Sequence, residues 1–586
     1  MLRGGARDAP ERHQTLHAVV DWSWNLLEPA GRVAMRALSV FPGGFTADAA
    51  RQVLGGGDAA DLEHLADQSL LQVADTPAGT RFRMLETVRE FSVAEREAAG
   101  ETDQVVAGFL AWARDFGMAH HEAPFGADPF AAVERIRAEQ DNLVHALRLA
   151  LARADGASVA AAVAVLLGLW IVESRWARVG AVVEEAAPPL SRFRPAPELV
   201  EVTRTALVEC TLFTFLIEGP RAARSLLALR RLPPAPPDTP MRAAVIVLNA
   251  ATAEDPSTLQ VLCDSDEPLV AGIADSVVSY LRENQGDLDG ALKAAERMLE
   301  ALEQRKVAWL SALVQCRIAE LCLQVERGPE AGHHLRAALP VLERIGAWSD
   351  VVGLHWWTVL ASLQAGDVDE AERWLERAAP HRAEEPVGVL TYGLGVRAEI
   401  LLARGEVEGG LRLWRRAVDL LTNAEGPIFD LDMDPSEEPW VLEAKAVAVV
   451  AHAQHGRLDL VEGTAAELPR RLSTMLANPA AKPPPWLVEL PVLGALLLAL
   501  AMVDLDRGAR DGDERATRSG ARLVALAERF RFLRMFQPTM SSARARQAAE
   551  RADRSAYDDA VSSYADLGHD GLRAAALDAL RARPQR

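Results

Sequence analysis

A short glycine turn recurs along the second half of the chain and constrains its fold more than any other feature. Its full form is glycine, acid, apolar residue, acid, as in GDLD at 286–289 and GDVD at 366–369. Related forms follow at Gly405, Gly456 and, shortened, at Gly328, so the successive intervals are 42, 38, 39 and 51 residues. Glycine ends a helix in the left-handed conformation, and an acidic residue favours the start of the next helix. The pattern predicts helix–turn–helix units with a period near 40.

Units of this kind bury their apolar faces only against their neighbours, so we expect them to stack into a curved solenoid. The period is slightly longer than the ~34 residues of a tetratricopeptide repeat. In this register Gly366 should have a positive φ, and Ala291 and Ala371 should be buried between paired helices. The sequence therefore predicts a mainly α fold with a tetratricopeptide-like α-solenoid.

The first hundred residues follow a different pattern. Amphipathic helices extend to about residue 70, and the period then changes from 3.6 to two in Thr80–Leu85. Leu71 and Val73 can supply the partner strand of a hairpin. Glu86–Ala99 returns to a helical pattern. Helices, a hairpin and a closing helix predict a winged-helix module over residues 1–100.

Two patterns predict which side chains of this module are buried. Alternation in the second strand places Phe82 and Met84 on the core face and Arg81 on the opposite face. In the second helix, helical periodicity places Val33 on the same apolar face as Leu38. Ala37 and Phe41 share this face as well.

The charges of the module argue against DNA binding. The helix that would enter a DNA groove, Asp58–Leu71, has four acidic residues and no Arg or Lys. Recognition helices need cations near phosphates and polar donors for bases. The net charge of −20 also repels a phosphate backbone. We expect the module to pack against protein and expect no DNA contact through this chain alone.

Several motifs occur in an order that resembles a known family. They are RHQTL at 12–16 with DWS at 21–23, LSVFPGGFT at 38–46, DQSLL at 67–71 and RFRMLETVREF at 81–91. This order resembles the winged-helix segment of STAND-type regulators (signal-transduction ATPases with numerous domains), of the bacterial AfsR/SARP-like kind. EQDNL at 139–143 resembles the motif that opens the helical-repeat region of that family.

The chain departs from that family in its nucleotide chemistry. In the family the winged helix follows a P-loop ATPase domain, which this sequence lacks. No lysine is preceded by glycine, so no GK[ST] phosphate loop exists. A histidine that contacts the nucleotide in some STAND relatives is replaced here by Leu85. We therefore expect no cofactor and neither binding nor hydrolysis of ATP.

No motif predicts a catalytic site or a metal site, and we expect the chain not to be an enzyme. Neither GxSxG nor HExxH occurs. The spacing of Asp430, Asp432 and Asp434 imitates the start of a calcium loop. Pro435 and Val441 stand where that loop needs glycine and glutamate, so a solvated acidic loop is the better interpretation.

Histidines were the other candidate metal ligands. His452 and His455 lie about one helical turn apart, but no third ligand is near in sequence. They precede a glycine at a helix C-terminus, where the helix dipole favours a cation. The pairs His120-His121 and His333-His334 are adjacent and point to different sides of a helix. None of these predicts a metal site.

The cysteines and the apolar segments predict a cytoplasmic protein. Cys210, Cys263, Cys316 and Cys322 form no CxxC pair and are expected to be buried thiols in a reducing compartment. The N-terminal residues lack the apolar stretch of a signal peptide. The longest uncharged apolar run, Pro491–Val503, has 13 residues, whereas a membrane span needs about 20.

The length allows about four domain-sized units. We assign residues 1–100 to the winged-helix-like module, 101–195 to a helical connector, 196–480 to the repeats and 481–586 to a C-terminal helical segment. A proline-rich stretch at 231–240 cannot be helical throughout. Tryptophans crowd the repeats, and we expect most of the following in the core and the rest along a partner-binding groove: Trp309, Trp348, Trp356, Trp357, Trp374 and Trp414.

These observations favour a non-catalytic regulatory and protein-interaction module, the sensor part of a STAND-like transcriptional regulator detached from its ATPase. The expected partners are a protein, a P-loop ATPase encoded nearby, or an effector on the repeat groove, with no membrane. One alternative is a free-standing helical-repeat scaffold protein. Another is a DNA-binding winged-helix repressor.

Overall fold

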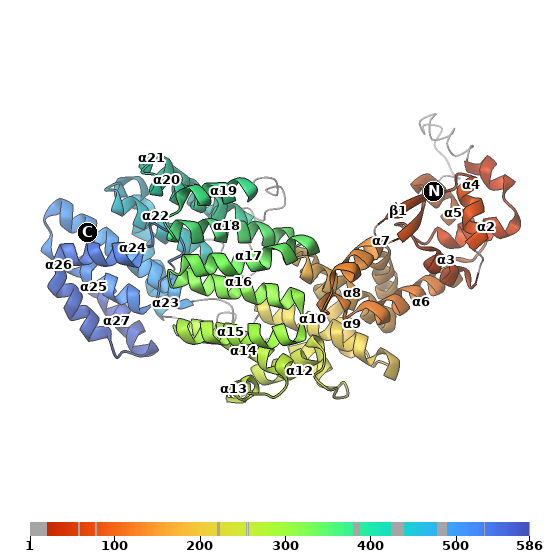
Figure 1. Ribbon diagram of the computed structural model, residues 1–586, viewed down its shortest axis with the longest axis horizontal. Coiled ribbons are helices and arrows are strands. Elements are labelled where there is room, and N and C mark those ends of the chain that lie inside the picture. The colour runs from red at the N-terminus through yellow and green to blue at the C-terminus, as the bar shows by residue number, and fades with distance from the viewer. Residues whose placement is uncertain are drawn as a thin grey trace. The chain divides into compact units, whose positions relative to one another are not determined.

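The structure is a computed structural model that describes residues 20–56, 59–76, 79–218, 223–253, 255, 257–378, 387–423, 439–477, 489–532 and 534–584. The fold is mainly α, as the sequence predicted (Figure 1). The chain divides into two compact units. The first unit is residues 1–213 with 223–245, and the second unit is residues 214–222 with 246–586.

The first unit begins with the order of elements predicted for the N-terminal module. Residues 20–26 are helical. They are followed by α2 (Pro29–Leu38), α3 (Ala47–Leu54), α4 (Ala59–Asp67), β1 (Leu71–Thr76), β2 (Gly79–Met84) and α5 (Glu86–Ala98). The two strands pair antiparallel with Val73 opposite Phe82, so the predicted hairpin is confirmed.

Local signals explain where these helices begin and end. The hydroxyl of Thr46 accepts a hydrogen bond from the Ala49 amide at 3.2 Å and caps α3, which ends at Gly55 with a φ of 71°. Val33, which shares a helix face with Leu38 by sequence periodicity, is 48% exposed, whereas Leu38 is fully buried. The apolar stripe of α2 is narrower than the sequence periodicity indicated.

Helices complete the first unit around an apolar centre. They are α6 (Thr102–His120), η1 (Ala123–Phe125), α7 (Phe130–Ala152), α8 (Gly156–Val172), α9 (Trp176–Arg192), η2 (Pro197–Leu199), α10 (Val200–Glu218), α11 (Ala223–Leu229) and α12 (Pro240–Ala251), of which α10 and α12 extend into the second unit. α8 has no charged residue and packs against α6, α7 and α9. Such an apolar helix is stable only when it is buried on all sides.

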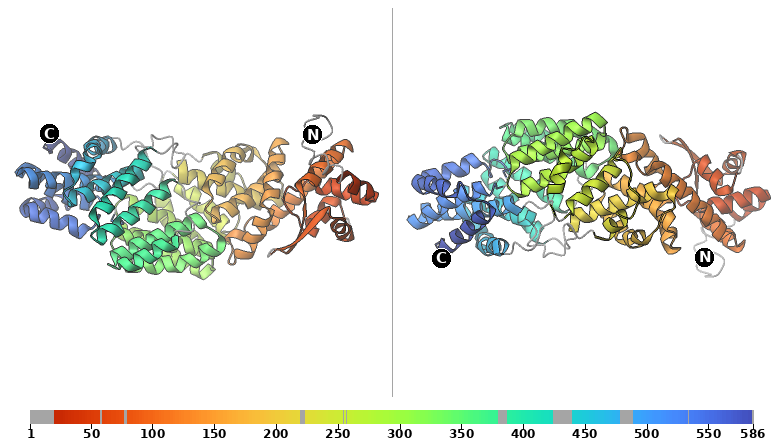
Figure 2. Two further views of the ribbon diagram at one scale, coloured as in Figure 1. Left: turned by 90° about the horizontal axis from the view of Figure 1, so that it is seen from above. Right: turned by 90° about the horizontal axis from the view of Figure 1, so that it is seen from below.

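The second unit is built from helices that pack in antiparallel pairs. They are α13 (Ser257–Cys263), α14 (Pro268–Asn284), α15 (Leu288–Arg305), α16 (Ala308–Gln324), α17 (Gly328–Ile345), α18 (Trp348–Gln364), α19 (Val368–Ala378), α20 (Val387–Ala403), α21 (Val407–Thr422), α22 (Pro439–Gln454), η6 (Leu458–Val461), α23 (Glu462–Ala477), α24 (Glu489–Asp511), α25 (Glu514–Arg529), α26 (Ser542–Tyr564) and α27 (His569–Ala582). The pairs α14/α15, α16/α17, α18/α19 and α20/α21 pack closely, and the green helices stay side by side in the views of Figure 2.

The longest apolar run of the sequence lies in this unit. It falls within α24, whose residues from Val492 to Met502 are buried wherever they are apolar. None of the described helices is both long enough and apolar enough to span a membrane.

The predicted turns are confirmed at four glycines. Gly286, Gly366, Gly405 and Gly456 have φ values of 80°, 79°, 81° and 64°. The prediction for Gly328 is wrong, because Gly328 begins α17. The left-handed residue of that turn is Glu326, with a φ of 61°.

The corrected register makes the repeat more regular than the glycines alone indicated. Left-handed residues at 286, 326, 366 and 405 are separated by 40, 40 and 39 positions. The geometry of the helix end requires one left-handed residue, and glutamate can occupy that conformation at some cost in strain. A repeat register based on glycine alone therefore places this turn at Gly328, two residues after the left-handed residue Glu326.

Small residues follow each turn at the same distance. Ala291, Ala331 and Ala371 lie five residues after the left-handed residue and are fully buried, which confirms the prediction for Ala291 and Ala371. The equivalent residue of the next unit is Gly410, where an added Cβ would lie 2.7 Å from Leu402 Cγ. A small residue here allows the two helices of a unit to approach closely.

Replacing Gly366 by valine is expected to lower the free energy of unfolding by about 1 kcal/mol or more, because a β-branched residue is strained at a positive φ. Urea unfolding followed by circular dichroism measures the change. The matched control is Gly353→Val within α18, where the φ is helical and no atom lies within 4 Å of the added Cβ. Equal stability of the two variants would contradict the turn assignment.

Candidate functional site

Three of the sequence motifs meet at one buried junction in the first unit. Arg81 on β2 donates from Nη1 to Oε1 of Glu139 on α7 at 2.5 Å. Asn142 on α7 donates from Nδ2 to Glu139 Oε2 at 2.6 Å and to the carbonyl of Gly44 at 2.9 Å. The amide of Gly43 donates back to Asn142 Oδ1 at 3.0 Å. The loop at 42–44 and strand β2 are thereby bound to α7, which opens the helical region.

This junction explains why Arg81 is buried, although its side chain lies on the face of β2 opposite to Phe82 and Met84. The exposed fractions of the Arg81 and Glu139 side chains are 10% and 4%. The sequence pattern of β2 predicts that its Arg81 face is exposed to solvent, but α7 packs over that face. A buried cation requires a charged partner, and Glu139 supplies it. A Cβ at Gly44 would lie 3.2 Å from the Phe82 carbonyl, so the loop also requires a small residue there.

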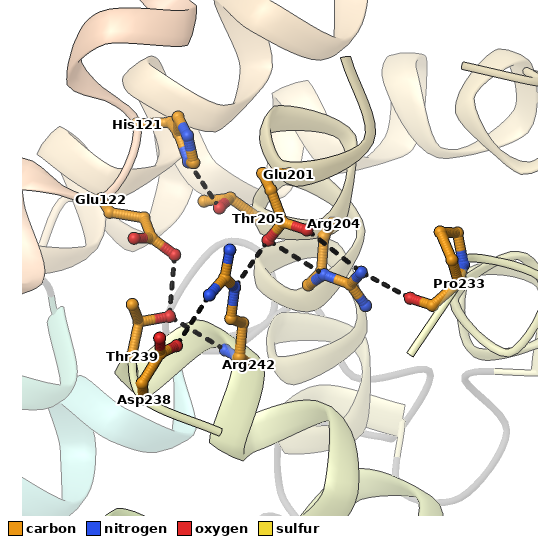
Figure 3. A network of polar contacts seen from close by, with 9 residues as sticks. All are labelled: His121, Glu122, Glu201, Arg204, Thr205, Pro233, Asp238, Thr239 and Arg242. Atoms are coloured by element: carbon orange, nitrogen blue, oxygen red, sulfur yellow. Dashed lines mark hydrogen bonds and ion pairs between the residues drawn. The ribbon is translucent and has the colours of Figure 1, made fainter. Parts of the chain in front are cut away.

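A second polar cluster of the first unit surrounds Arg242 at the start of α12 (Figure 3). Arg242 donates from Nε to Glu201 Oε2 at 2.8 Å and from Nη1 to Asp238 Oδ1 at 2.7 Å. Arg204 contacts the same Glu201 at 3.3 Å and donates to the carbonyl of Pro233 at 2.7 Å. Burial opposes the ionised form of Glu201, but the hydrogen bonds from Arg242 and Arg204 outweigh it and lower its pKa.

The other half of this cluster joins the end of α6 to the same segment (Figure 3). The imidazole Nδ1 of His121 lies 2.7 Å from the hydroxyl of Thr205. Thr239 donates to Glu122 Oε1 at 2.9 Å and accepts the Arg242 amide at 3.4 Å, which caps α12. Burial lowers the pKa of His121 to about 4, so His121 is neutral near pH 7. Burial also raises the pKa of Glu122.

The cluster around Arg242 holds the proline-rich stretch at 231–240 against α10 and the end of α6. Prolines prevent that stretch from forming a helix with its own backbone hydrogen bonds. Side chains from three elements bind this stretch. Within the cluster, Glu201 is paired with Arg204 and Arg242, and Asp238 is paired with Arg242. This arrangement acts as a structural clamp.

Of the histidine pair, His452 has both ring nitrogens in contact with other residues of the chain. His452 Nδ1 lies 2.7 Å from the carbonyl of Ala448, and Nε2 lies 2.9 Å from Arg415 Nη1. Burial lowers the pKa of His452 to about 4, so the helix C-terminus does not hold it as a cation. Asp430, Asp432 and Asp434 lie outside the described residues. Among the residues that are described, no group of three or more His, Cys, Asp or Glu side chains could hold a metal ion.

The remaining candidates are structural. His120 packs on Phe116 with ring centroids 4.5 Å apart, and His334 Nδ1 contacts Gln315. All four cysteines are buried, and none of them forms a disulfide. Burial raises the pKa of the Cys263 and Cys322 thiols to about 12 in each case, which makes them poor nucleophiles.

The predicted groove tryptophans lie inside the second unit. Trp309, Trp356, Trp374 and Trp414 are buried, and Trp348 and Trp357 are partly buried. The expectation that most of them lie in the core is therefore confirmed, and the expectation that the rest line a groove stays a prediction for Trp348 and Trp357. The buried tryptophans fill the space between helix pairs, where their large apolar area is most stabilising. The tryptophans that the described residues do expose, Trp22 and Trp176, belong to the first unit.

Sequence reasoning missed a row of polar side chains at the ends of the repeat helices. Glu326, Gln364, Glu399 and Gln454 each hydrogen-bond the segment between α25 and α26. Gln364 and Gln454 are the last residues of α18 and α22, two positions before the left-handed glycines. That shared position was the available sequence signal.

Comparison with known proteins places regulators among the relatives. No family model matches the chain. The protein named "Putative HTH-type transcriptional regulator Mb0914c" of Mycobacterium bovis is 39% identical over 109 residues, which are 18% of this chain and 12% of that protein. A Mycobacterium tuberculosis protein with no assigned function is 31% identical over 118 residues, 19% of this chain and 30% of that protein. Each match therefore spans only a minor part of the relative's length.

Two solved structures are similar in outline. One is the signal-transduction ATPase with numerous domains (STAND) protein with a tetratricopeptide repeat sensor from Pyrococcus horikoshii, 12% identical, with a TM-score of 0.36 over 96% of this chain and 67% of that one. The other is a Rap protein complexed with competence and sporulation factor, 12% identical, with a TM-score of 0.40 over 68% of this chain and 98% of that one. Both scores are below 0.5, so neither bears on function. The fold itself defines the class: a mainly α, solenoid-like helical-repeat protein.

Proposed function

We propose that this chain is the non-catalytic, protein-binding sensor region of a STAND-like transcriptional regulator, and that it acts together with a P-loop ATPase. The observation that carries the proposal is the buried junction of Arg81, Glu139 and Asn142. It joins the motifs whose order resembles that family. Because the N-terminal module is bound to α7 through buried charge, a change in one is transmitted to the other without a flexible linker.

The exposed apolar side chains of the module support a protein partner. Trp22 and Leu26 lie one turn apart on the first helix and are 66% and 57% exposed, and Val33 on α2 is 48% exposed. Trp24 and Leu27 cover the core side of the same helix. Exposed aromatic and aliphatic side chains on one surface are typical of protein interfaces, in which tryptophan contributes strongly to binding.

The charges of α4 support the choice of a protein over DNA. α4 has the sequence AADLEHLAD, with three acidic residues and no Arg or Lys. Without cations this helix has nothing to pair with phosphates. The DNA-binding repressor is therefore the weaker alternative.

We expect Trp22→Ser in the full chain to weaken binding to a P-loop ATPase encoded nearby by about tenfold or more, since a buried interface tryptophan is commonly a hot spot. Isothermal titration calorimetry measures the affinity. Trp176→Ser is the matched control, because Trp176 is 42% exposed elsewhere in the first unit.

Equal affinity of the two variants would refute the docking surface. Unrelated genes beside this one, with binding to other proteins unaffected by Trp22→Ser, would favour the free-standing scaffold. Salt-sensitive binding of the full chain to duplex DNA would favour the repressor.

A further inference from the structure

The segment that links α25 to α26 lies across the ends of the repeat helices. This segment, residues 530–541, is called the α25–α26 connector; residue 533 is not among the described residues. Its described residues form no helix or strand, and residues 537–540 form a turn. Far in sequence from the repeats, it contacts residues of successive helix pairs between Glu326 and Gly494.

Side chains of the repeats bind the main chain of the connector. Gln364 Nε2 donates to the Arg534 carbonyl at 3.2 Å, and Gln454 Nε2 donates to the Thr539 carbonyl at 2.9 Å. The Thr539 amide donates to Glu399 Oε2 at 2.9 Å. The Met540 amide donates to the Phe536 carbonyl at 2.7 Å, so the connector forms a turn at this point. Main-chain groups are common to all peptides, so these contacts fit a peptide of varied sequence that adopts the same turn.

Two further contacts select particular side chains. The hydroxyl of Thr539 donates to Glu399 Oε1 at 2.7 Å. The amide group of Gln537 donates from Nε2 to Glu326 Oε1 at 2.7 Å. Both acceptors are carboxyl groups, and Arg534 Nη1 of the connector also lies 3.8 Å from Glu326 Oε2.

An aromatic pocket receives Phe536. The ring meets Trp414 edge to face, with centroids 5.1 Å apart. Gly395 on α20 makes the room, because a Cβ there would lie 3.0 Å from Phe536 Cε1 and 2.7 Å from Trp414 Cη2. Gly494 on α24 does the same for the main chain, since its Cβ would lie 2.8 Å from the Phe532 amide nitrogen.

The connector does not satisfy every polar atom that it covers. Gln364 Oε1 and Arg534 Nε are buried and have no hydrogen-bond partner among the described residues. A buried polar atom without a partner destabilises the arrangement that buries it. A peptide that donates a hydrogen bond to Gln364 Oε1, and that buries no unsatisfied guanidinium in the place of Arg534, would therefore bind the row better than the connector does.

We propose that the connector is an internal ligand of a peptide-binding groove, and that a protein partner displaces it with a segment that forms the same turn and carries an aromatic residue three positions before a threonine or serine. The aromatic residue takes the place of Phe536, and the hydroxyl takes the place of Thr539 on Glu399. The inference rests on the proposed protein-binding function and names the class of partner for the second unit.

Hydrogen exchange on the full chain tests whether the connector opens by itself. The Thr539 amide is expected to exchange at least about tenfold faster than the buried amides of α22, such as that of Val449, because it opens locally while α22 opens only with the whole unit. Equal protection of the two would identify the connector as permanent core and overturn the proposal. This measurement needs no variant.

A peptide with the sequence of residues 530–541, acetylated and amidated at its ends, tests the groove. It is expected to bind the full-length Phe536→Ala variant about tenfold or more tightly than the unaltered chain, because the weakened connector competes less. The same peptide with alanine for the aromatic residue at 536 is the control and should not bind. Fluorescence anisotropy of a labelled peptide measures both.

Absence of peptide binding to a Phe536→Ala variant that keeps its helical circular dichroism would overturn the proposal. If that variant does not fold, the exchange measurement on the unaltered chain still decides. The Trp22 test concerns the first unit, so failure of the connector proposal and failure of the proposed function give different results.

Discussion

Replacing Glu139 by alanine is expected to lower the free energy of unfolding by about 3–5 kcal/mol, because it leaves the buried guanidinium of Arg81 without a counter-charge. The same change removes the Glu139 partner of Asn142, which is fully buried. Chemical unfolding of the full chain, monitored by tryptophan fluorescence, reports the loss.

Two control variants separate buried charge from charge in general. Glu86→Ala breaks the ion pair with Arg89, in which Glu86 is 64% exposed, and should cost less than about 1 kcal/mol. The double variant Arg81→Met with Glu139→Leu should recover most of the loss, since it buries no charge. If Glu139→Ala proves as mild as Glu86→Ala, the junction does not hold the module in place.

Replacing Arg317 by methionine is expected to have an effect of similar size in the second unit, about 3–5 kcal/mol. The guanidinium contacts Glu283 and lies 3.9 Å above the ring of Tyr280, and Nη1 donates to Glu320 at 2.8 Å. Burial opposes its charge, but Glu320 and Glu283 raise the pKa of Arg317 above its ordinary value. Methionine keeps much of the volume and leaves the fully buried Glu283 carboxylate without its cation.

Thermal and urea unfolding measure this second effect. Arg282→Ala is the control, because the pair of Arg282 with Asp287 is 34% and 50% exposed and should contribute less than about 1 kcal/mol. The double variant Arg317→Met with Glu283→Leu is expected to be much more stable than the single variant. A single variant that unfolds with the unaltered chain would show that this charge pair adds nothing to the packing of α14 on α16.

The local signals of the sequence predicted four repeat turns correctly and misplaced one, the turn near Gly328. Gly286, Gly366, Gly405 and Gly456 end helices because glycine adopts a positive φ without strain. Glu326 adopts the same conformation, and no sequence rule distinguishes it from an ordinary helical glutamate. The turn became visible only through the helices on either side of it.

The burial of a side chain was predictable where the periodicity of its own helix or strand determines it. It was not predictable where a distant helix covers the side chain or fails to cover it. The alternation of β2 placed Phe82 inside correctly. The same alternation left Arg81 for solvent, but α7 covers that face, and nothing within residues 80–85 encodes the position of α7. Val33 shows the opposite case, in which an apolar side chain on a helical stripe stays exposed because no described neighbour covers it.

By itself the sequence determined what depends on neighbours along the chain: the helical class, the hairpin, the helix ends at glycine and the small residues five positions later. Tertiary structure alone decided what depends on residues far apart. Glu399 and Thr539 are 140 positions apart in the sequence, whereas the residues of a repeat turn are close neighbours along the chain. Only the folded chain brings Glu399 Oε1 within 2.7 Å of the Thr539 hydroxyl. Periodicity reports which face of a helix is apolar, because that follows from the backbone geometry. It does not report which distant segment will cover that face, because many segments have the same composition and only one fits the space.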